Sequence, residues 1–195
     1  MDTSPAVSLI QAYCQSHQRV LNLAEHMTDA QLSWCPVPTA HTIAFHLWHI
    51  ARWADHLQAA IPGMTAVLAQ RLGAGVQIWE QEALAAHWGF STHALGYAAT
   101  GMHMPDEIAR ALHFPEKAKL LNYVQCAVVA AERAVHAIDE EQFCAAEQPQ
   151  PLTEGIWDAG TVGDAILSHV VHINRHLGAI ECLYGCQVGS GTASV

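Results

Sequence analysis

Positively charged residues are scarce in this sequence of 195 residues. It contains eight lysines and arginines against 18 aspartates and glutamates, which gives a formal net charge of −10 with neutral histidines. A protein with this balance would repel the phosphate backbone of a nucleic acid, because binding needs cationic side chains to neutralise the phosphates. The composition therefore argues against nucleic-acid binding and against polyanionic substrates.

Charged residues of both signs are few, since they make up 13% of the chain, whereas hydrophobic residues make up 51%. This composition excludes an intrinsically disordered protein, which would have low hydrophobicity. It also suggests that a partner covers some apolar surface, and we expect a homodimer. The length fits one domain with an elaborated connection better than two domains, so we expect a single domain over residues 1–195.

Long hydrophobic runs and targeting signals are also missing. No stretch of about 18 uninterrupted apolar residues occurs, and the N-terminal sequence MDTSPAVSLIQAYCQ lacks the basic region of a secretory signal. We therefore expect a cytoplasmic protein that does not enter a membrane. The six cysteines form no C-x-x-C pair, and we expect reduced thiols that mostly occupy the core.

Hydrophobic periodicity predicts four long helices. Apolar residues recur at helical spacing in residues 6–27, 41–60, 115–138 and 161–184. The second helix is expected to end at Pro62, and the fourth is expected to end at Gly185. The pattern predicts an all-α fold, an antiparallel four-helix bundle with a long insertion between the second and third helices.

The insertion, residues 61–114, differs from the rest of the chain in composition. Six glycines interrupt it, so we expect only short helical pieces, such as residues 76–88 and 105–112. Connections of this length in a compact domain usually cover a functional site or form an interface. At the other end of the sequence, we expect residues 187–195 to form a flexible tail.

Three histidines share one face of the last predicted helix. His169, His172 and His176 lie at positions i, i+3 and i+7, within about 60° of arc at roughly 100° per residue. His172 and His176 are one turn apart, so both imidazoles can reach one metal ion, whereas His169 and His176 are two turns apart. Such a pair also arises by chance in a chain with 14 histidines, so a metal site needs a third ligand from elsewhere.

The second predicted helix repeats part of this pattern. Its segment HLWHIARW aligns with HVVHINRH of the fourth helix, and both contain H-x-x-H-I-x-R. In this internal repeat His49 matches His172, and His46 matches His169. Two such helices facing each other would bring His49 to His172, and His176 would be the third ligand.

Three imidazoles from two helices predict a site for one divalent transition-metal ion. Neutral imidazole nitrogens bind zinc at about 2.0–2.1 Å, and three protein ligands leave positions open for water or substrate, as in catalytic zinc sites. We expect zinc in the first place, with nickel, iron and manganese as alternatives. Cys182 and Cys186 are a weaker alternative as ligands, because by spacing they lie more than a turn beyond His176.

These motifs resemble the DinB/YfiT-like superfamily of metal-binding four-helix bundles. The resemblance lies in HLWHIARWADH, in HVVHINRHLGAIECLYG and in the long crossover after the second helix. It implies that His49, His172 and His176 are the metal ligands. Members commonly have H-x-G-Q-I after the last ligand, whereas this chain has HLGAI, with Ala179 in place of the glutamine. Characterised relatives include thiol-dependent transferases and isomerases, so the resemblance implies a metal enzyme without naming its substrate.

Neighbouring aromatic and histidine side chains are candidates for supporting or lining the site. His46 and His169 each lie one turn N-terminal to the ligand layer, so we expect them to support the ligands rather than to bind the metal. Trp53 lies one turn after His49 and is a candidate lining residue.

Three charged residues near the histidines have two interpretations each. Arg52 and Arg175 match across the internal repeat, and we expect salt bridges first and binding of a substrate carboxylate second. Asp55 follows His49 by six residues. We expect it on the solvated surface, with orientation of a ligand imidazole as the alternative.

Three functions remain open from the sequence. The first is a metal-dependent transferase or isomerase that acts on a small electrophilic substrate with a low-molecular-weight thiol as a second cofactor. The second is a metal-dependent hydrolase, although no glutamate of the H-E-x-x-H kind is present. The third is a non-catalytic bundle that sequesters a metal or a small ligand.

Overall fold

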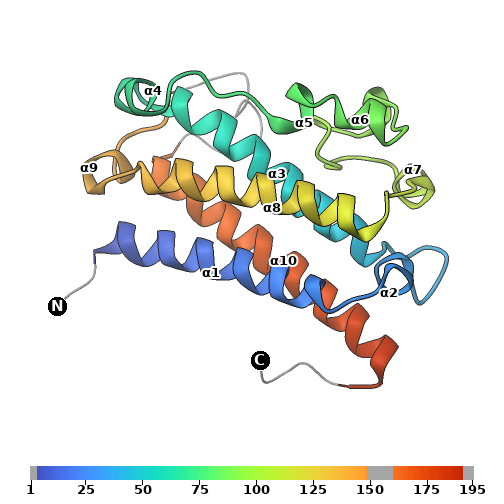
Figure 1. Cartoon of the computed structure of the whole chain (residues 1–195). Coiled ribbons are helices and arrows are strands. Elements are labelled where there is room, and N and C mark those ends of the chain that lie inside the picture. Colours follow the sequence, from blue (N-terminus) through green and yellow to red (C-terminus); the bar gives the residue numbers. More distant parts are fainter. Residues whose placement is uncertain (1–3, 149–159, 191–195) are drawn as a thin grey trace.

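Four long helices form the body of the protein. The structure, a computed structural model, describes residues 4–148 and 160–190. Within these ranges the long helices are α1 (Pro5–Glu25), α3 (Ile43–Met64), α8 (Lys117–His136) and α10 (Val162–Val188). Each packs against two of the others, in the pairs α1 with α10, α10 with α3, α3 with α8 and α8 with α1 (Figure 1). The predicted all-α fold is confirmed.

The directions of the four helices follow from the long crossover. In Figure 1, α1 and α10 run from left to right, whereas α3 and α8 run from right to left. The pairs α1 with α8 and α3 with α10 are therefore antiparallel. The pairs α1 with α10 and α3 with α8 run the same way, because the segment between α3 and α8 returns the chain to the end where α3 began.

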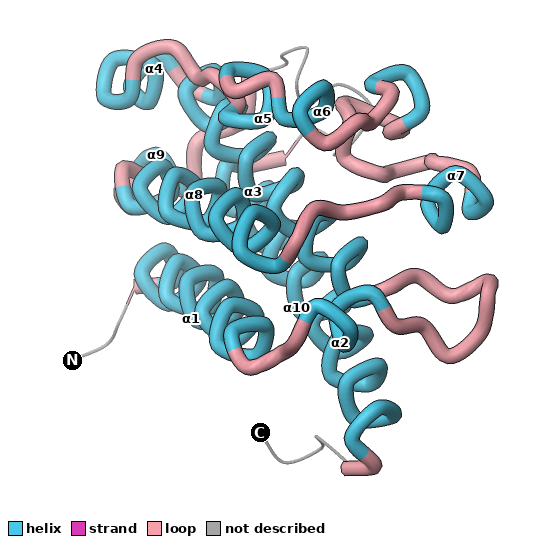
Figure 2. Tube along the Cα trace, turned by 45° about the vertical axis from the view of Figure 1, so that its right-hand side comes forward, coloured by secondary structure: helices cyan, strands magenta, loops and turns pink. Residues whose placement is uncertain are grey.

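The crossover between α3 and α8 contains only short helices, as its glycines predict. They are α4 (Ala66–Leu72), α5 (Ile78–Gln81), α6 (Leu84–His87), the 3₁₀ helix η1 (Thr92–Ala94) and α7 (Asp106–Ala111). Figure 2 shows α4, α5 and α6 along one side of the bundle, next to α3. Two further short helices, α2 (Asp29–Ser33) and α9 (Glu140–Phe143), lie in the other connections.

Helix α3 is the central helix, and side chains are buried on nearly every side of it. The fully buried apolar ones include Leu47, Trp48, Leu57 and Ile61. Other parts of the protein must therefore cover this helix all round. Helices α8 and α10 cover part of it, and the crossover covers the rest through α4 and α5.

Two helix ends differ from the predictions. Helix α3 begins after His41, with the Thr42 hydroxyl accepting a hydrogen bond from the Phe45 N–H at 3.1 Å, and it continues through Pro62 to Met64. Pro62 has no N–H, so the helix loses the hydrogen bond that position 62 would donate to the carbonyl of Gln58. Helix α8 begins after Glu116, so Pro115 precedes the helix rather than opening it.

Helix α10 is longer than its sequence suggests. The Thr161 hydroxyl accepts from the Asp164 N–H, and the Asp164 carboxylate accepts from the Thr161 N–H, which together form a capping box. The helix passes Gly185 and ends at Val188, where Gly189 adopts a left-handed φ of 67°. Residues 187 and 188 of the expected tail therefore belong to the helix, and residues 191–195 lie outside the described ranges.

The six cysteines lie at or near the surface of the protein. All six cysteines are free thiols, as expected, but none is fully buried, and four of them are exposed. The prediction that most of the cysteines occupy the core was wrong.

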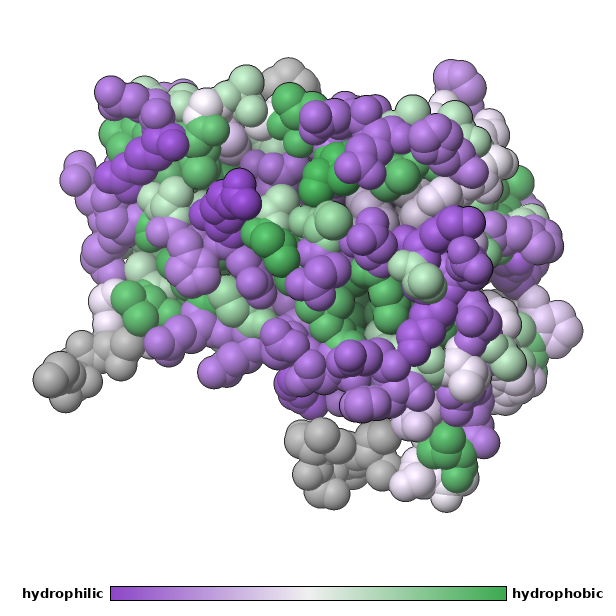
Figure 3. Space-filling view, in the orientation of Figure 1, coloured by the Kyte–Doolittle hydropathy of each residue, from purple (hydrophilic) through white to green (hydrophobic). Residues whose placement is uncertain are grey.

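On the face drawn in Figure 3, hydrophobic side chains form small patches between hydrophilic ones. None of the helices in the described ranges combines the length and apolar character that crossing a membrane requires.

Candidate metal centre

The structure brings the three predicted ligands together where α3 and α10 cross. His49 comes from α3, and His172 and His176 come from consecutive turns of α10. One ring nitrogen of each lies within 4.8 Å of the others, and this is the metal-compatible group found among the described residues. The ring centroids of His172 and His176 are 4.5 Å apart, and each lies within 4.9 Å of the His49 centroid.

A backbone carbonyl fixes the tautomer of His49. Its Nδ1 lies 2.5 Å from the carbonyl oxygen of Thr100, which belongs to the crossover. A carbonyl can only accept, so Nδ1 carries the ring proton and Nε2 keeps its lone pair. Metal-binding histidines usually donate their other ring N–H to such a partner. The role of Thr100 could not be predicted from the sequence, because every residue has a main-chain carbonyl and the residue type does not show which one contacts His49.

The spacing of the nitrogens suits a shared cation. His49 Nε2 lies 3.0 Å from His172 Nε2. Two nitrogens bound to one tetrahedral ion at about 2.0–2.1 Å each are separated by about 3.3 Å. Because His49 Nε2 carries a lone pair, the proton in this contact belongs to His172 Nε2. A metal ion between the two nitrogens therefore requires this proton to move to His172 Nδ1, together with a small outward movement of the rings. The donor set of three imidazoles suits zinc and the neighbouring transition metals.

The three rings are neutral at physiological pH. Burial lowers the pKa of His49 to about 4. Burial, together with the weaker repulsion between the cationic forms of neighbouring histidines, lowers the pKa values of His172 and His176 to about 2. Neutral imidazole is the form that binds a metal. The site therefore presents its lone pairs without first releasing a proton at pH 7.

The two histidines predicted to support the site take different positions. His46 Nδ1 lies 2.9 Å from His176 Nδ1. The tautomer of His176 that offers Nε2 to a metal therefore donates its Nδ1 proton to His46. His169 is buried one turn below the ligands and is not part of the three-histidine group. Burial, together with repulsion from His56 and His17, lowers its pKa to about 3.

The ring of Trp53 packs beside the ligands His49 and His172, and its role in lining the site stays a prediction. The centroid of its ring lies 5.8 Å from that of His172, 5.9 Å from that of His169 and 6.4 Å from that of His49. The side chain is 6% exposed. It therefore packs against both the ligand His172 and the buried His169.

The structure agrees with the expectation for Arg52 but not with that for Asp55. Arg52 forms the expected salt bridge, at 2.9 Å to Asp55, and both side chains are fully buried. The expectation of a solvated Asp55 was wrong, because the crossover covers it and donates the N–H groups of Ile78 and Trp79 to its carboxylate. Arg175 is exposed on α10, and no salt bridge links it to another described residue.

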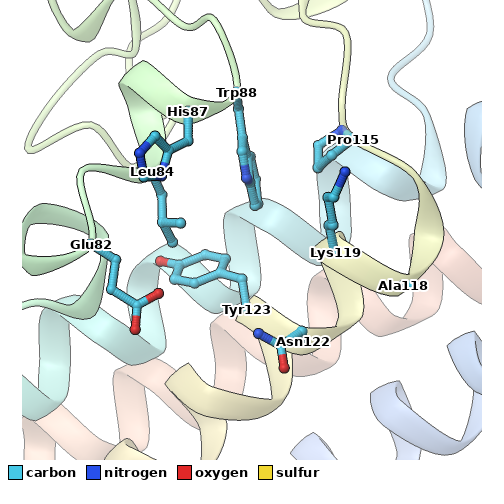
Figure 4. A pocket seen from close by; sticks show the side chains of 9 residues that line it. All are labelled: Glu82, Leu84, His87, Trp88, Pro115, Ala118, Lys119, Asn122 and Tyr123. Atoms are coloured by element: carbon cyan, nitrogen blue, oxygen red, sulfur yellow. The ribbon is translucent and has the colours of Figure 1, made fainter.

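A separate pocket of about 590 Å³ lies between α6 and the first turns of α8. Figure 4 shows the rings of Trp88 and Tyr123 facing it, with Glu82 and Lys119 near its edges. None of the three histidines lines it. The pocket is therefore distinct from the candidate metal centre.

Comparisons with known proteins agree with the helical fold described above. A crystal structure of a conserved protein from Enterococcus faecalis is similar, with a TM-score of 0.70 at 18% sequence identity over 97% of this chain and 100% of that chain. At this identity the likeness concerns the fold alone. A comparison with curated proteins finds no match. The sequence model of the DinB superfamily matches residues 12–180, which include all three histidines, and this chain therefore belongs to the DinB superfamily.

Proposed function

We propose that this protein is a metal-dependent enzyme that binds one divalent transition-metal ion, zinc in the first place, through His49, His172 and His176. The observation that carries the proposal is the group of three neutral imidazoles, one of them held by a backbone carbonyl with its Nε2 lone pair directed at a second ligand. Three protein ligands leave room for a substrate at the ion.

The reaction we propose is a thiol-dependent transfer or isomerisation of a small electrophile. A divalent ion with three neutral ligands keeps its full charge, and such an ion lowers the pKa of a thiol that binds it. No carboxylate joins the three histidines in the described part of the chain. This supports a thiol reaction over hydrolysis, which usually needs a nearby general base. We further propose, from the sequence, a cytoplasmic homodimer.

The metal part of the proposal is tested by elemental analysis of protein purified without added metal. We expect about one divalent ion per chain in the wild type and loss of the ion in His49→Ala and His176→Ala. His169→Gln is the matched control and should keep its stoichiometry, because His169 lies outside the ligand group. Retention of the ion in either alanine variant would exclude that histidine as an essential ligand.

The reaction is tested with the cobalt form of the protein. Addition of glutathione, bacillithiol or mycothiol should produce a sulfur-to-metal charge-transfer band with at least one of them, followed by consumption of an electrophile that depends on His49. Hydrolysis of an ester or amide without a thiol-dependent band would replace the transferase proposal with the hydrolase. A bound ion with neither activity would support a metal-sequestering bundle.

A further inference from the structure

Arg52 of α3 holds one turn of the crossover, residues 96–102, which we call the crossover turn. All five N–H donors of its buried guanidinium have an acceptor. The acceptors belong to Asp55, Gln77, Ala98, Ala99 and Tyr123. Two of these acceptors are carbonyl oxygens of the crossover turn, at 3.0 Å for Ala98 and 2.9 Å for Ala99. A planar guanidinium can bind neighbouring carbonyls in this way, whereas an ammonium group lacks the fork.

The crossover turn has an unusual backbone that needs such support. Ala98 and Ala99 have φ angles of 45° and 53°, in the left-handed region that residues with a Cβ rarely adopt. Such residues persist where the surrounding structure determines their conformation, and they gather at functional sites. Here the carbonyls of both residues accept hydrogen bonds from Arg52, and the next residue is Thr100.

The crossover turn ends against the ligand His49. The carbonyl of Thr100 accepts the Nδ1 proton of His49, and Thr100 is fully buried. Gly101 follows with a φ of 90°, and a Cβ at this position would lie 2.9 Å from the Trp48 ring and 3.0 Å from His49 Nδ1. The turn therefore approaches His49 as closely as a residue without a side chain allows.

We propose that Arg52 is a positioning residue that acts through the crossover turn to fix the orientation and tautomer of His49. This inference rests on the proposed metal site and extends it, because it assigns to the inserted crossover the role of orienting the ligand His49. The carbonyl of Thr100 holds the imidazole, and Arg52 holds the segment that carries this carbonyl. Asp55 in turn offsets the buried charge of Arg52.

Gly101→Ala tests the contact between the turn and the ligand. Its added methyl group should push the turn away from His49, so we expect zinc affinity to fall about 10–100-fold, as for other changes next to metal ligands. Gly89→Ala is the matched control. Gly89 has a similar φ of 73°, but nothing lies within 4 Å of its added Cβ. The control also places an alanine at a positive φ, but without the push on His49.

A second readout uses metal-free protein and separates positioning from general damage. Nitrogen-15 NMR of the histidine rings should show His49 in wild type and in Gly89→Ala as the Nδ1-protonated tautomer. In Gly101→Ala we expect a mixture of both tautomers. Equal zinc affinity and the same fixed tautomer in the two alanine variants would overturn the proposal.

Arg52→Lys tests the other end of the chain of contacts. Lysine keeps the positive charge but cannot donate to both the Ala98 and Ala99 carbonyls as the planar guanidinium does. As for Gly101→Ala, we expect a lower zinc affinity and a mixture of His49 tautomers. Arg71→Lys is its control, because Arg71 also bonds a carbonyl, that of Ala137, and a carboxylate, that of Asp139, away from the site. Unchanged His49 signals in a folded Arg52→Lys protein would contradict the role of Arg52. Failure of the wild type to bind zinc would instead defeat the proposed function, and the tautomer readout would still test the positioning.

Discussion

His17 of α1 shows how strongly single buried histidines couple this protein to pH. The side chain is fully buried, and neither ring nitrogen has a hydrogen-bond partner in the described ranges. Burial lowers its pKa to about 3 from an ordinary value of 6.5. Between these two values the unfolded chain binds a proton that the folded chain does not bind. The free energy of unfolding therefore decreases as the pH falls below 6.5.

The change His17→Leu should remove this contribution. The leucine keeps an apolar contact with the edge of the Tyr13 ring, whose centroid lies 4.5 Å from that of His17. On going from pH 7 to pH 5, metal-free wild type should lose about 2 kcal/mol more stability than the variant, at about 1.4 kcal/mol per pH unit below 6.5. Urea denaturation at both pH values measures the difference. Parallel pH profiles of the two proteins would show that His17 is already protonated or solvated in the folded state.

At the scale of one element, the start of α3 depends on the Thr42 hydroxyl, which caps the helix that carries His46 and His49. Replacing a capping threonine by alanine typically costs about 1 kcal/mol. We therefore expect Thr42→Ala to lower the free energy of unfolding by about this amount, with Thr42→Ser as a control that keeps the oxygen. Denaturant titration with an unchanged m-value is the measurement. Equal losses in both variants would assign the effect to the methyl group of threonine rather than to the cap.

The elements also show what could be predicted from the sequence. Local periodicity is sufficient for the four long helices and for the pairing of His172 with His176, since both depend only on 3.6 residues per turn. The internal repeat was enough to place His49 beside them. The binding of a metal by these three residues stays a prediction.

Features that depend on distant contacts could not be predicted. The burial of Asp55 depends on two N–H groups more than 20 residues away in the crossover, and the support of His49 depends on the carbonyl of Thr100. All three of these partners are main-chain groups, so the residue types do not indicate the contacts. The end of α3 was misplaced for another reason. The rule that a proline ends a helix does not hold here, because α3 continues through Pro62 to Met64 with the loss of one N–H donor.

At the scale of the whole molecule, the metal would join α3 to α10 and should stabilise the fold. A ligand that binds only the folded state adds about 2.7 kcal/mol at a free concentration of 100 times its dissociation constant. We expect zinc to raise the free energy of unfolding of the wild type by this amount and a chelator to reverse the change. Calorimetry or thermal denaturation at controlled free zinc measures it. His176→Ala should not respond, and an equal response in this variant would place the zinc elsewhere.

The buried guanidinium of Arg52 also limits how far this protein can be reduced in size. A minimal bundle made by joining the end of α3 directly to α8 would remove Gln77, Ala98 and Ala99, and with them three of the five acceptors of Arg52. The same deletion would expose Arg52 and Asp55 to solvent, because the crossover covers this side of α3, although their salt bridge would remain. An engineer who shortens the chain must therefore replace the apolar side chains of α3 that the crossover shields, and must supply a new acceptor for His49 in the same design.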